Sequence, residues 1–303
     1  MKKVKSKKFG EKLKSKTTSQ KFLKPQKLAE ANLFTMSAIQ VSLREQARNV
    51  LLCENAEKKA QCAFDVFTSH QKGEHNTSLL DTEGWPERPG RPEKPELLDP
   101  RDMPKRRSGG HAGRIGLLHA LAHIELNAID LAFDLLGRYE NTPMPEEFYF
   151  DWLRVGAEEA KHFMLLQGRL KSLGSSYGAL PAHDGLWEAA LNTAHNLAAR
   201  LAVVPMVLEA RGLDVTPQMI EKLTKNGDKE SADILEVIYE DEKTHVAIGS
   251  KWFSYLCQKQ NKDPQTQYQN YVQTYFRGDI KPPFNKPARD EAGLPEEFYI
   301  FAR

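Results

Sequence analysis

The sequence has few cysteines and lacks a long apolar run. Its 303 residues include three cysteines, Cys53, Cys62 and Cys257, without the Cys-x-x-Cys spacing of zinc sites. An odd number of thiols predicts a reduced, cytoplasmic compartment rather than a disulfide-bonded scaffold. The nearest candidate for a membrane span, Leu201–Leu208, is far shorter than the roughly 18 residues required, so we expect no membrane contact.

Strand signals are also missing. No stretch of useful length alternates apolar and polar residues, whereas long segments after Gly109 and Gly110 show helical apolar spacing. Hydrophobic residues make up 40% of the chain and charged residues 28%, which is typical of a soluble globular protein of one or two domains. The sequence therefore predicts an all-α fold.

The expected architecture is a four-helix bundle with additions at both ends. We divide the chain into a basic, disordered tail (1–34), a helical extension with a proline-rich strap (35–108), the bundle (109–260) and an irregular C-terminal segment that covers it (261–303). The four bundle helices are expected at about residues 112–136, 145–173, 186–211 and 229–258. Residues 35–67 predict one long helix or two short ones.

The strap is marked by Pro86, Pro89, Pro92 and Pro95, which recur at every third residue as in polyproline II. Such a segment either packs on the bundle or recruits a proline-binding domain, and we favour packing.

The N-terminal tail is strongly basic. Residues 1–30 contain eleven lysines against Glu11 and Glu30, a local charge of +9 that leaves −7 on the rest of the chain. Such a run can bind RNA, an acidic partner or a membrane surface. No aromatic ladder or apolar helical face accompanies it, so we favour a solvated, disordered tail over RNA contact.

Two Glu-x-x-His pairs are the first candidates for chemistry: Glu159 with His162, and Glu242 with His245. The composition alone gives about one such pair by chance, so their placement matters more than their number. Projected on a helix, each pair lies in the middle of an apolar stripe that faces the core.

Two further glutamates, Glu125 and Glu209, are each the only acid in the apolar stripe of their helix. A buried carboxylate without a partner is costly, so four such groups indicate bound metal. Four carboxylates and two imidazoles are a ligand set for two iron or manganese ions, whose charges would balance. The alternative is a set of buried ion pairs with arginines: Arg114, Arg154, Arg169 or Arg200.

Four motifs carry a family resemblance: "LLHALAHIELNAIDLAFD", "EEAKHF", "LEARGLDVTP" and "YEDEKTHVAIG". With the ligand pattern, they resemble the ferritin-like di-iron carboxylate superfamily. More narrowly, the chain from about Arg91 to Gly293 is similar to a mainly bacterial ferritin-like family catalogued as domain of unknown function 455. The resemblance implies that Glu159 and Glu242 bridge two metals, that Glu125 and Glu209 are terminal ligands, and that each histidine binds one ion.

The acids that precede the two pairs, Asp241 and Glu158, are candidates for supporting roles. In related di-iron oxygenases such an acid orients a ligand histidine on the other helix, and the alternative is solvent exposure. His119 and His123 lie opposite Glu125, so we expect them to contact the N-terminal segment or water. His195 is expected to be a core histidine.

Three residues near the ligands bear on the shape of the core. Pro205 predicts a kink in the third bundle helix. Gly156 and Gly249 either make room for oxygen or a substrate, or allow close helix packing.

An O2-dependent oxidoreductase, a hydroxylase or oxidase, is the function that this pattern favours. It would use two iron ions, or manganese or a mixed pair, with O2 or peroxide, an unknown substrate and an electron donor. One alternative is iron handling, as a ferroxidase or peroxide scavenger. Another is a scaffold that metal stabilises without catalysis.

Overall fold

The computed structural model describes residues 42–73, 84–104 and 110–301. In these ranges the fold is all-α, as predicted, without a named strand, and an isolated bridge joins Leu97 and Ala182. The basic tail lies outside the described residues. The helices are α1 (Leu43–Leu52), α2 (Ala56–Gln71), α3 (Gly110–Arg138), α4 (Glu146–Ser172), α5 (Gly185–Asn192), α6 (Leu197–Val203), η1 (Val204–Glu209), α7 (Ala210–Lys225), α8 (Lys229–Lys259), α9 (Pro264–Tyr275), α10 (Lys286–Glu291) and α11 (Glu296–Tyr299).

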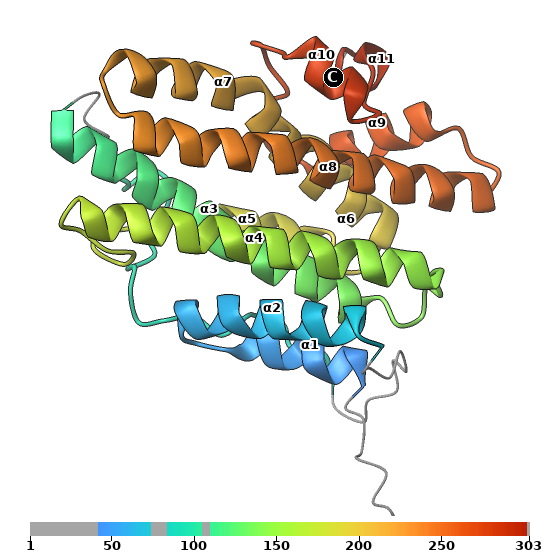
Figure 1. The fold of residues 1–303 in the computed structure, drawn as a ribbon. Coiled ribbons are helices and arrows are strands. Elements are labelled where there is room, and N and C mark those ends of the chain that lie inside the picture. The colour runs from blue at the N-terminus through green and yellow to red at the C-terminus, as the bar shows by residue number, and fades with distance from the viewer. Residues whose placement is uncertain (1–41, 74–83, 105–109, 302–303) are drawn as a thin grey trace, which may run out of the picture. The chain divides into compact units, whose positions relative to one another are not determined.

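Four helical runs form the centre of the fold: α3, α4, α8 and the consecutive α6, η1 and α7 (Figure 1). α3 packs along α4, α8 packs along α7 and η1, and α4 contacts α8 between these two pairs. Buried aromatic side chains, such as Phe133, Trp152 and Phe253, fill the space between them. This arrangement is compatible with the expected four-helix bundle.

One helix, α3, passes a length and composition test for crossing a membrane. Of its most apolar window, 67% is buried inside the protein. That burial fits a core helix of a soluble protein, because such helices are apolar on most of their surface.

The N-terminal extension contains two helices rather than one. Ser42 caps α1 by accepting a hydrogen bond from the Glu45 amide, and Asn55 caps α2 by accepting one from Lys58. A capping side chain satisfies an amide that the helix itself leaves free, so the second cap separates the two helices. α1 contacts α3, and α2 contacts α4 (Figure 1).

The proline-rich residues 84–104 lie against the helices. The Gly90 amide donates to the Leu51 carbonyl at 2.9 Å, and a Cβ on Gly90 would lie 2.2 Å from the carbonyl oxygen of the next residue, Leu52. The Arg91 guanidinium donates to Asn127 on α3 at 2.6 Å. Backbone bonds also join Leu98 and Ala182 at 2.9 Å. These contacts fix the segment along α3 and the loop before α5.

The expected third helix, 186–211, is wrong in both its continuity and its end. The chain leaves the helix after Asn192 and re-enters at Leu197, where the Asn196 side chain accepts from the Ala199 amide. Thr193 instead bonds its hydroxyl to backbone carbonyls, which competes with helix continuation. Downstream, α7 runs through Gly212 and Pro217, because its buried face continues to residue 223.

The C-terminal segment was expected to be irregular, but it contains α9, α10 and α11. Asp263 and Asn285 accept hydrogen bonds from the amides of Thr266 and Ala288, and a proline follows each cap within the first helical turn. Pro264 is the first residue of α9, and Pro287 is the second residue of α10. A side-chain cap followed by proline in the first turn is an ordinary helix-start signal, and the high proline and aromatic content of the segment obscured it.

A buried carboxylate, that of Asp134 on α3, joins separate parts of the fold through hydrogen bonds. It accepts hydrogen bonds from Trp85 at 2.7 Å, Arg138 at 2.8 Å and Arg200 at 2.6 Å. Burial would raise the pKa of Asp134, but the charge of Arg200 and the bond from Arg138 outweigh it and lower the pKa. Arg200 is itself fully buried, so each charge depends on the other.

We expect Asp134→Asn to destabilise the fold by about 3–5 kcal/mol, because it leaves the Arg200 charge buried without a counter-charge. Urea denaturation measures the difference. The control is Asp233→Asn, which removes an exposed pair with Lys229 and should cost less than about 1 kcal/mol. Equal effects of the two substitutions would refute the central role of Asp134.

Candidate metal centre

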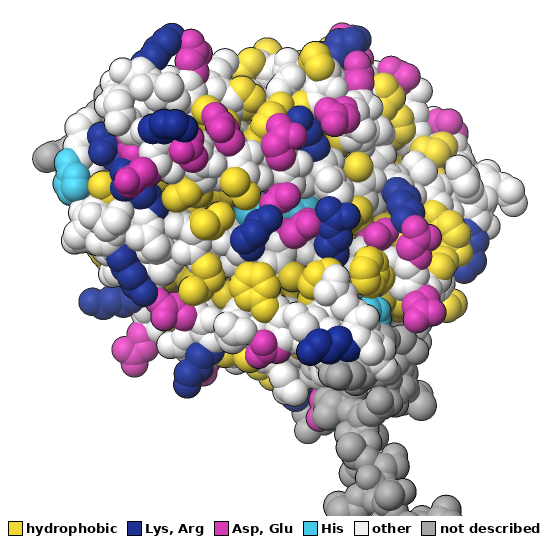
Figure 2. All heavy atoms as spheres, in the orientation of Figure 1, with side chains coloured by type: hydrophobic (Ala, Val, Ile, Leu, Met, Phe, Trp, Pro, Cys, Tyr) yellow, Lys and Arg dark blue, Asp and Glu magenta, His cyan; other side chains and the backbone are white. Residues whose placement is uncertain are grey.

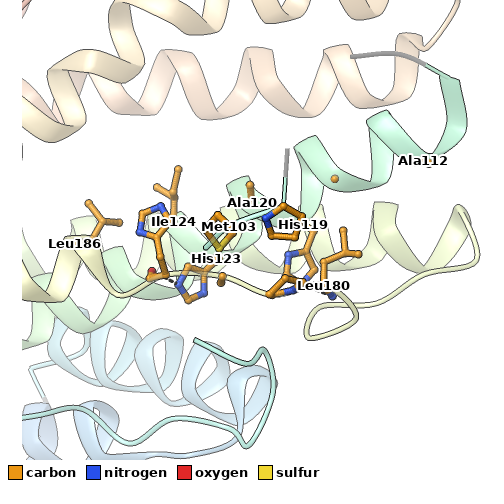
Figure 3. A pocket seen from close by; sticks show the side chains of 13 residues that line it. Met103, Ala112, His119, Ala120, His123, Ile124, Leu180 and Leu186 are labelled. Atoms are coloured by element: carbon orange, nitrogen blue, oxygen red, sulfur yellow. Dashed lines mark hydrogen bonds between the residues drawn. The ribbon is translucent and has the colours of Figure 1, made fainter. Parts of the chain in front are cut away.

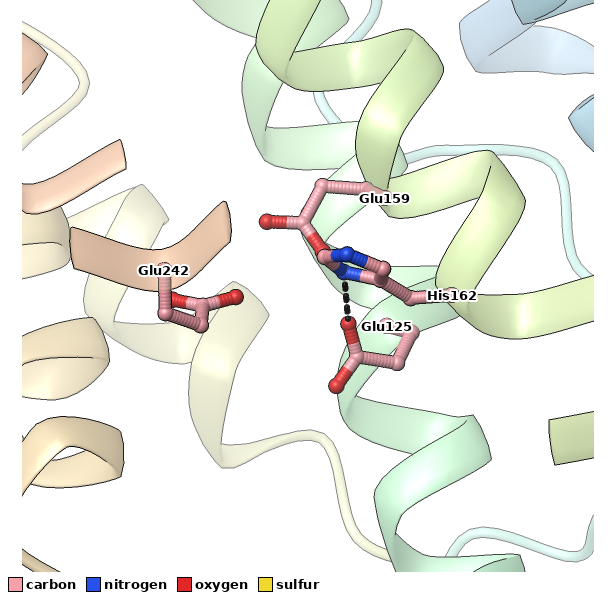
Figure 4. Close-up of side chains that lie close together, drawn as sticks. All are labelled: Glu125, Glu159, His162 and Glu242. Atoms are coloured by element: carbon pink, nitrogen blue, oxygen red, sulfur yellow. Dashed lines mark hydrogen bonds and ion pairs between the residues drawn. The ribbon is translucent and has the colours of Figure 1, made fainter. Parts of the chain in front are cut away.

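Three helices bring four of the six predicted ligands together. Glu125 comes from α3, Glu159 and His162 from α4, and Glu242 from α8, and one ligand atom from each lies within 4.8 Å of all the others. Figure 4 shows these side chains converging on one point. Glu125, Glu159 and His162 are almost completely buried. A cluster of carboxylates and imidazole in this geometry can hold a metal ion.

The Nδ1 atoms of both histidines face the glutamates. His162 Nδ1 lies 3.1 Å from Glu125 Oε2 and 3.4 Å from Glu159 Oε2. His245 Nδ1 lies 3.0 Å from Glu159 Oε1 and 3.4 Å from Glu242 Oε1. The two oxygens of Glu159 therefore face different histidines, which places this carboxylate between them.

The Nε2 atoms point the other way, each toward an acid on the opposite helix. His162 Nε2 donates to Asp241 Oδ2 at 2.9 Å, and His245 Nε2 donates to Glu158 Oε2 at 2.9 Å. The contacts are reciprocal, because α4 supplies the acid for the α8 histidine and α8 supplies the acid for the α4 histidine. Fixing the Nε2 proton in this way leaves Nδ1 as the atom available to a metal.

Two cations cover these acids on the outer side. Lys161 pairs with Asp241, and Arg154 pairs with Glu158 at 2.9 Å. The outer face of α4 and α8 accordingly shows acidic and basic side chains next to one another (Figure 2). The sequence alone indicates the pairing of Arg154 with Glu158, because the two residues are four positions apart on one helix. It does not indicate the pairing of Lys161 with Asp241, which lies on another helix.

The fifth residue, Glu209, comes from a local distortion. The expected kink at Pro205 is a six-residue π-helix, Val204–Glu209. Proline lacks an amide proton and crowds the preceding turn, and a wider turn relieves both problems. Glu209 is the last residue of this segment and lines the same cavity as Glu125, Glu159 and Glu242.

Of the two roles predicted for Gly156 and Gly249, neither glycine makes room for oxygen or a substrate. A Cβ on Gly156 would lie 2.6 Å from Phe133, and a Cβ on Gly249 would lie 2.5 Å from Pro205. Both glycines therefore allow close packing of neighbouring side chains. The open volume is instead a cavity of about 190 Å³ that the four glutamates share with apolar side chains of α3, α7 and α8.

The arginines proposed as alternative partners bind other acids. In the described part of the chain, Arg114 pairs with Asp228, Arg154 with Glu158, Arg169 with Asp228 and Glu230, and Arg200 with Asp134. None of the four reaches Glu125, Glu159, Glu209 or Glu242. Buried ion pairs with these arginines therefore do not explain the four core glutamates.

Several buried atoms in the cluster have no hydrogen-bond partner in the described residues: Glu159 Oε1, Glu209 Oε2 and His245 Nδ1. Glu159 Oε1 and His245 Nδ1 lie 3.0 Å apart, yet they do not meet the angles of a hydrogen bond. Both atoms are therefore buried without a hydrogen bond. This is the arrangement that a metal ion would satisfy, so the residues fit a carboxylate and imidazole metal site.

Burial and mutual repulsion raise the pKa values of three glutamates. Burial, and then the negative charge of Glu159, raises the pKa of Glu125 well above its usual value. Burial and the charge of Glu242 do the same to the pKa of Glu209. Burial and the charge of Glu159 also raise the pKa of Glu242. Without a metal, the site therefore retains protons that an ion would displace.

The pKa values of the two histidines are also raised, whereas the pKa of Glu159 is lowered. Burial would lower the histidine pKa values, but bonds to Asp241 and Glu125 raise the pKa of His162. The charges of Glu159 and Glu242 likewise raise the pKa of His245. Burial would raise the pKa of Glu159, but the charge of His245 and a bond from His162 lower it. Glu159 is thus the glutamate that stays ionised.

The other histidines do not lie where we expected. His119 and His123 are buried against residues 177–183 rather than against water or the N-terminal segment. The hydroxyl of Tyr177 donates to His123 Nδ1 at 2.8 Å, and the Gly178 amide donates to His119 Nε2 at 3.0 Å. His195, expected in the core, is exposed beside Tyr275, because the helix breaks at its position.

Comparisons with known proteins assign a family but no activity. The family described as "Protein of unknown function (DUF455)" matches residues 52–300. A Haemophilus influenzae protein named "Uncharacterized protein" is 37% identical over 272 residues, which cover 86% of this chain and 93% of that relative. No solved structure matches the chain.

We expect the metal-free protein to lose stability as the pH rises from about 6 to about 8. Raised pKa values in the folded state, above 4.5 for Glu125 and Glu209 and above 6.5 for the two histidines, mean that the folded chain binds more protons than the unfolded chain. Glu159 adds no slope here, because its lowered pKa lies below this range. Chemical denaturation of chelator-treated protein at both pH values measures the change.

Glu125→Gln is the matched variant, because it keeps the shape of the side chain and removes one of these protons. Its stability should depend less steeply on pH. A metal-free protein that is equally stable at both pH values, or more stable at the higher one, would contradict these shifts.

Proposed function

Because the chain belongs to the DUF455 family, which has no known function, the site must indicate the activity, and we propose an O2-dependent oxidoreductase with two metal ions. The proposal includes the ferritin-like di-iron architecture that the sequence resembles. Its main support is the reciprocal pairing of the two Glu-x-x-His motifs, in which each Nδ1 faces the glutamates and each Nε2 is held by an acid.

Charge balance supports two ions rather than one. Four carboxylates carry four negative charges if all are ionised, and two divalent cations neutralise them. In this proposal Glu159 would hold both ions, since its two oxygens face different histidines. By resemblance, Glu242 would be the second glutamate shared by the ions. Glu125 and Glu209 would each hold one ion, and each histidine would bind through Nδ1.

The donor set suits iron, and we propose two Fe ions, with manganese or a mixed pair as the alternative. The ions would supply electrons for the reduction of O2 or peroxide. The chain itself supplies the geometry: Asp241 and Glu158 hold the histidine rings, and the cavity beside the glutamates is lined mainly by apolar side chains. A separate electron donor would be needed for turnover. We place the protein in the cytoplasm, where its thiols remain reduced.

We expect the purified protein to hold about two Fe or Mn ions per chain. Glu159→Ala should lose both ions, because it removes the carboxylate between the histidines. Glu242→Ala should lose at least one. The control, Glu147→Gln, changes an exposed acid that pairs with Lys251 and should retain both. Elemental analysis of folded protein gives the ratios, and unchanged metal in both alanine variants would refute the site.

Oxygen uptake then separates the three functional hypotheses. The ferrous protein should consume O2 in proportion to its metal and stop without a reductant. A growing mineral core would indicate iron storage instead. A loaded protein that reacts with neither O2 nor peroxide would leave the scaffold hypothesis.

We also expect Asp241→Asn and Glu158→Gln to weaken metal binding by roughly 10–100-fold, because each releases the ring of a ligand histidine. Competition with a chelator measures the affinity. The control, Glu240→Gln, removes an exposed acid that bonds Lys243 one residue before Asp241. If the two substitutions bind metal as tightly as this control, the acids do not orient the histidines.

A further inference from the structure

A second, larger cavity lies beside the candidate metal centre. Its volume is about 360 Å³, within the usual range for small-molecule sites. It is bounded by α3, by Met103 and Pro104, and by the chain from Leu180 to Leu186. In Figure 3, Leu180 and Leu186 lie on opposite sides of the group, and His119 and His123 lie between them.

Among the described residues, the wall of this cavity has no Asp, Glu, Lys or Arg side chain. Besides three histidines, it consists of glycine and apolar residues: Met103, Pro104, Ala112, Gly116, Ala120, Ile124, Leu180, Pro181, Ala182 and Leu186. A charged ligand would find no counter-charge here, and transfer of an unpaired charge from water is costly. The wall therefore suits an uncharged molecule with a large apolar part.

A buried histidine on the wall has a polar atom left for a ligand. His119 Nε2 accepts from the amides of Gly178 and Leu180, at 3.0 Å and 3.4 Å, so the ring proton is on Nδ1. Among the described residues Nδ1 has no hydrogen-bond acceptor, although His119 is only 2% exposed. Burial lowers the pKa of His119 to about 4, so the ring is neutral at physiological pH. It can donate one hydrogen bond to a ligand oxygen.

The wall is a built structure rather than a loose loop. His123 Nε2 donates to the His183 carbonyl at 3.0 Å, and the Tyr177 hydroxyl donates to His123 Nδ1 at 2.8 Å. The His119 ring stacks on Tyr177 with a centroid distance of 5.5 Å. These bonds hold residues 177–183 over α3 and keep the cavity open.

The two cavities share part of their lining. Ile124 and Leu186 border both the apolar cavity and the one that contains the glutamates. Ile124 directly precedes Glu125 on α3, and it is 45% exposed although its neighbours on either side are buried. A molecule in the larger cavity would therefore lie against the residue next to a candidate ligand.

We propose that the apolar cavity binds an uncharged, largely apolar organic molecule that carries a hydrogen-bond acceptor, with His119 as the donor. We further propose that this molecule is the substrate, and that Ile124 and Leu186 separate it from the glutamates. The binding site stands on its own geometry, whereas the role as substrate site rests on the proposed function.

Prodan, an uncharged naphthyl ketone whose emission shifts to the blue in apolar surroundings, is the probe for this site. It should bind the full-length protein with one site per chain. Anilinonaphthalene sulfonate has a similar ring system with a negative charge, and it should bind about tenfold more weakly or worse. Equal binding of the two probes would overturn the inferred ligand class.

A pair of glycine variants localises the probe. Gly116 lines the cavity and Gly168 lies on the exposed side of α4, and at either position an added Cβ meets nothing within 4 Å. Gly116→Phe should fill the cavity and weaken prodan binding about tenfold or more, while Gly168→Phe should bind like the parent. Ala120→Phe repeats the test if Gly116→Phe does not fold.

Metal content, measured on the same samples, separates the two proposals. Gly116→Phe should keep the metal of the parent protein. If the purified parent protein binds prodan but contains no metal, the binding site is supported and its role as a substrate site is overturned. Absent prodan binding, or full binding in both cavity-filling variants, would overturn the binding site whatever the metal content.

Discussion

The central constraint on this fold is the cost of placing carboxylates in a low-dielectric core. Elsewhere in the described protein, buried acids have cationic partners: Asp130 pairs with Lys59, Asp134 with Arg200, Asp214 with Arg289 and Asp228 with Arg169. In the described part of the chain, the four glutamates of the cluster form no ion pair with Lys or Arg. They share two histidines, which cannot neutralise all of them. The chain thus neutralises most of its buried acids with Lys or Arg. Only in the glutamate cluster is negative charge left for a metal ion to balance.

The sequence predicted the helices that contain this cluster better than the segments around them. Helices α3, α4 and α8 have long apolar stripes and clear ends, so periodicity alone placed Glu125, Glu159 and Glu242 on their inner faces. Periodicity could not find the break at Thr193–Asn196, because side-chain hydrogen bonds to the backbone decide it. Nor could it show that Pro205 produces a π-helix, which depends on packing against Gly249.

The larger cavity was beyond sequence analysis for a similar reason. His119 and His123 lie on the face of α3 opposite Glu125, and a helical projection shows only that the face is shared. The partner that buries them, residues 177–183, is some 60 positions away in the chain. Only the folded chain shows that this loop, which Tyr177 holds, forms one wall of the cavity and does not simply cover α3.

The reciprocal bonds between α4 and α8 have a consequence for how the two ligand sets behave. Glu158 and Glu159, adjacent on α4, both contact His245 of α8, while Asp241 of α8 contacts His162 of α4. A shift of one helix by a single turn would break these contacts together. If two ions bind as proposed, their positions would be thermodynamically linked, because occupation of one would fix the helix register that the other requires.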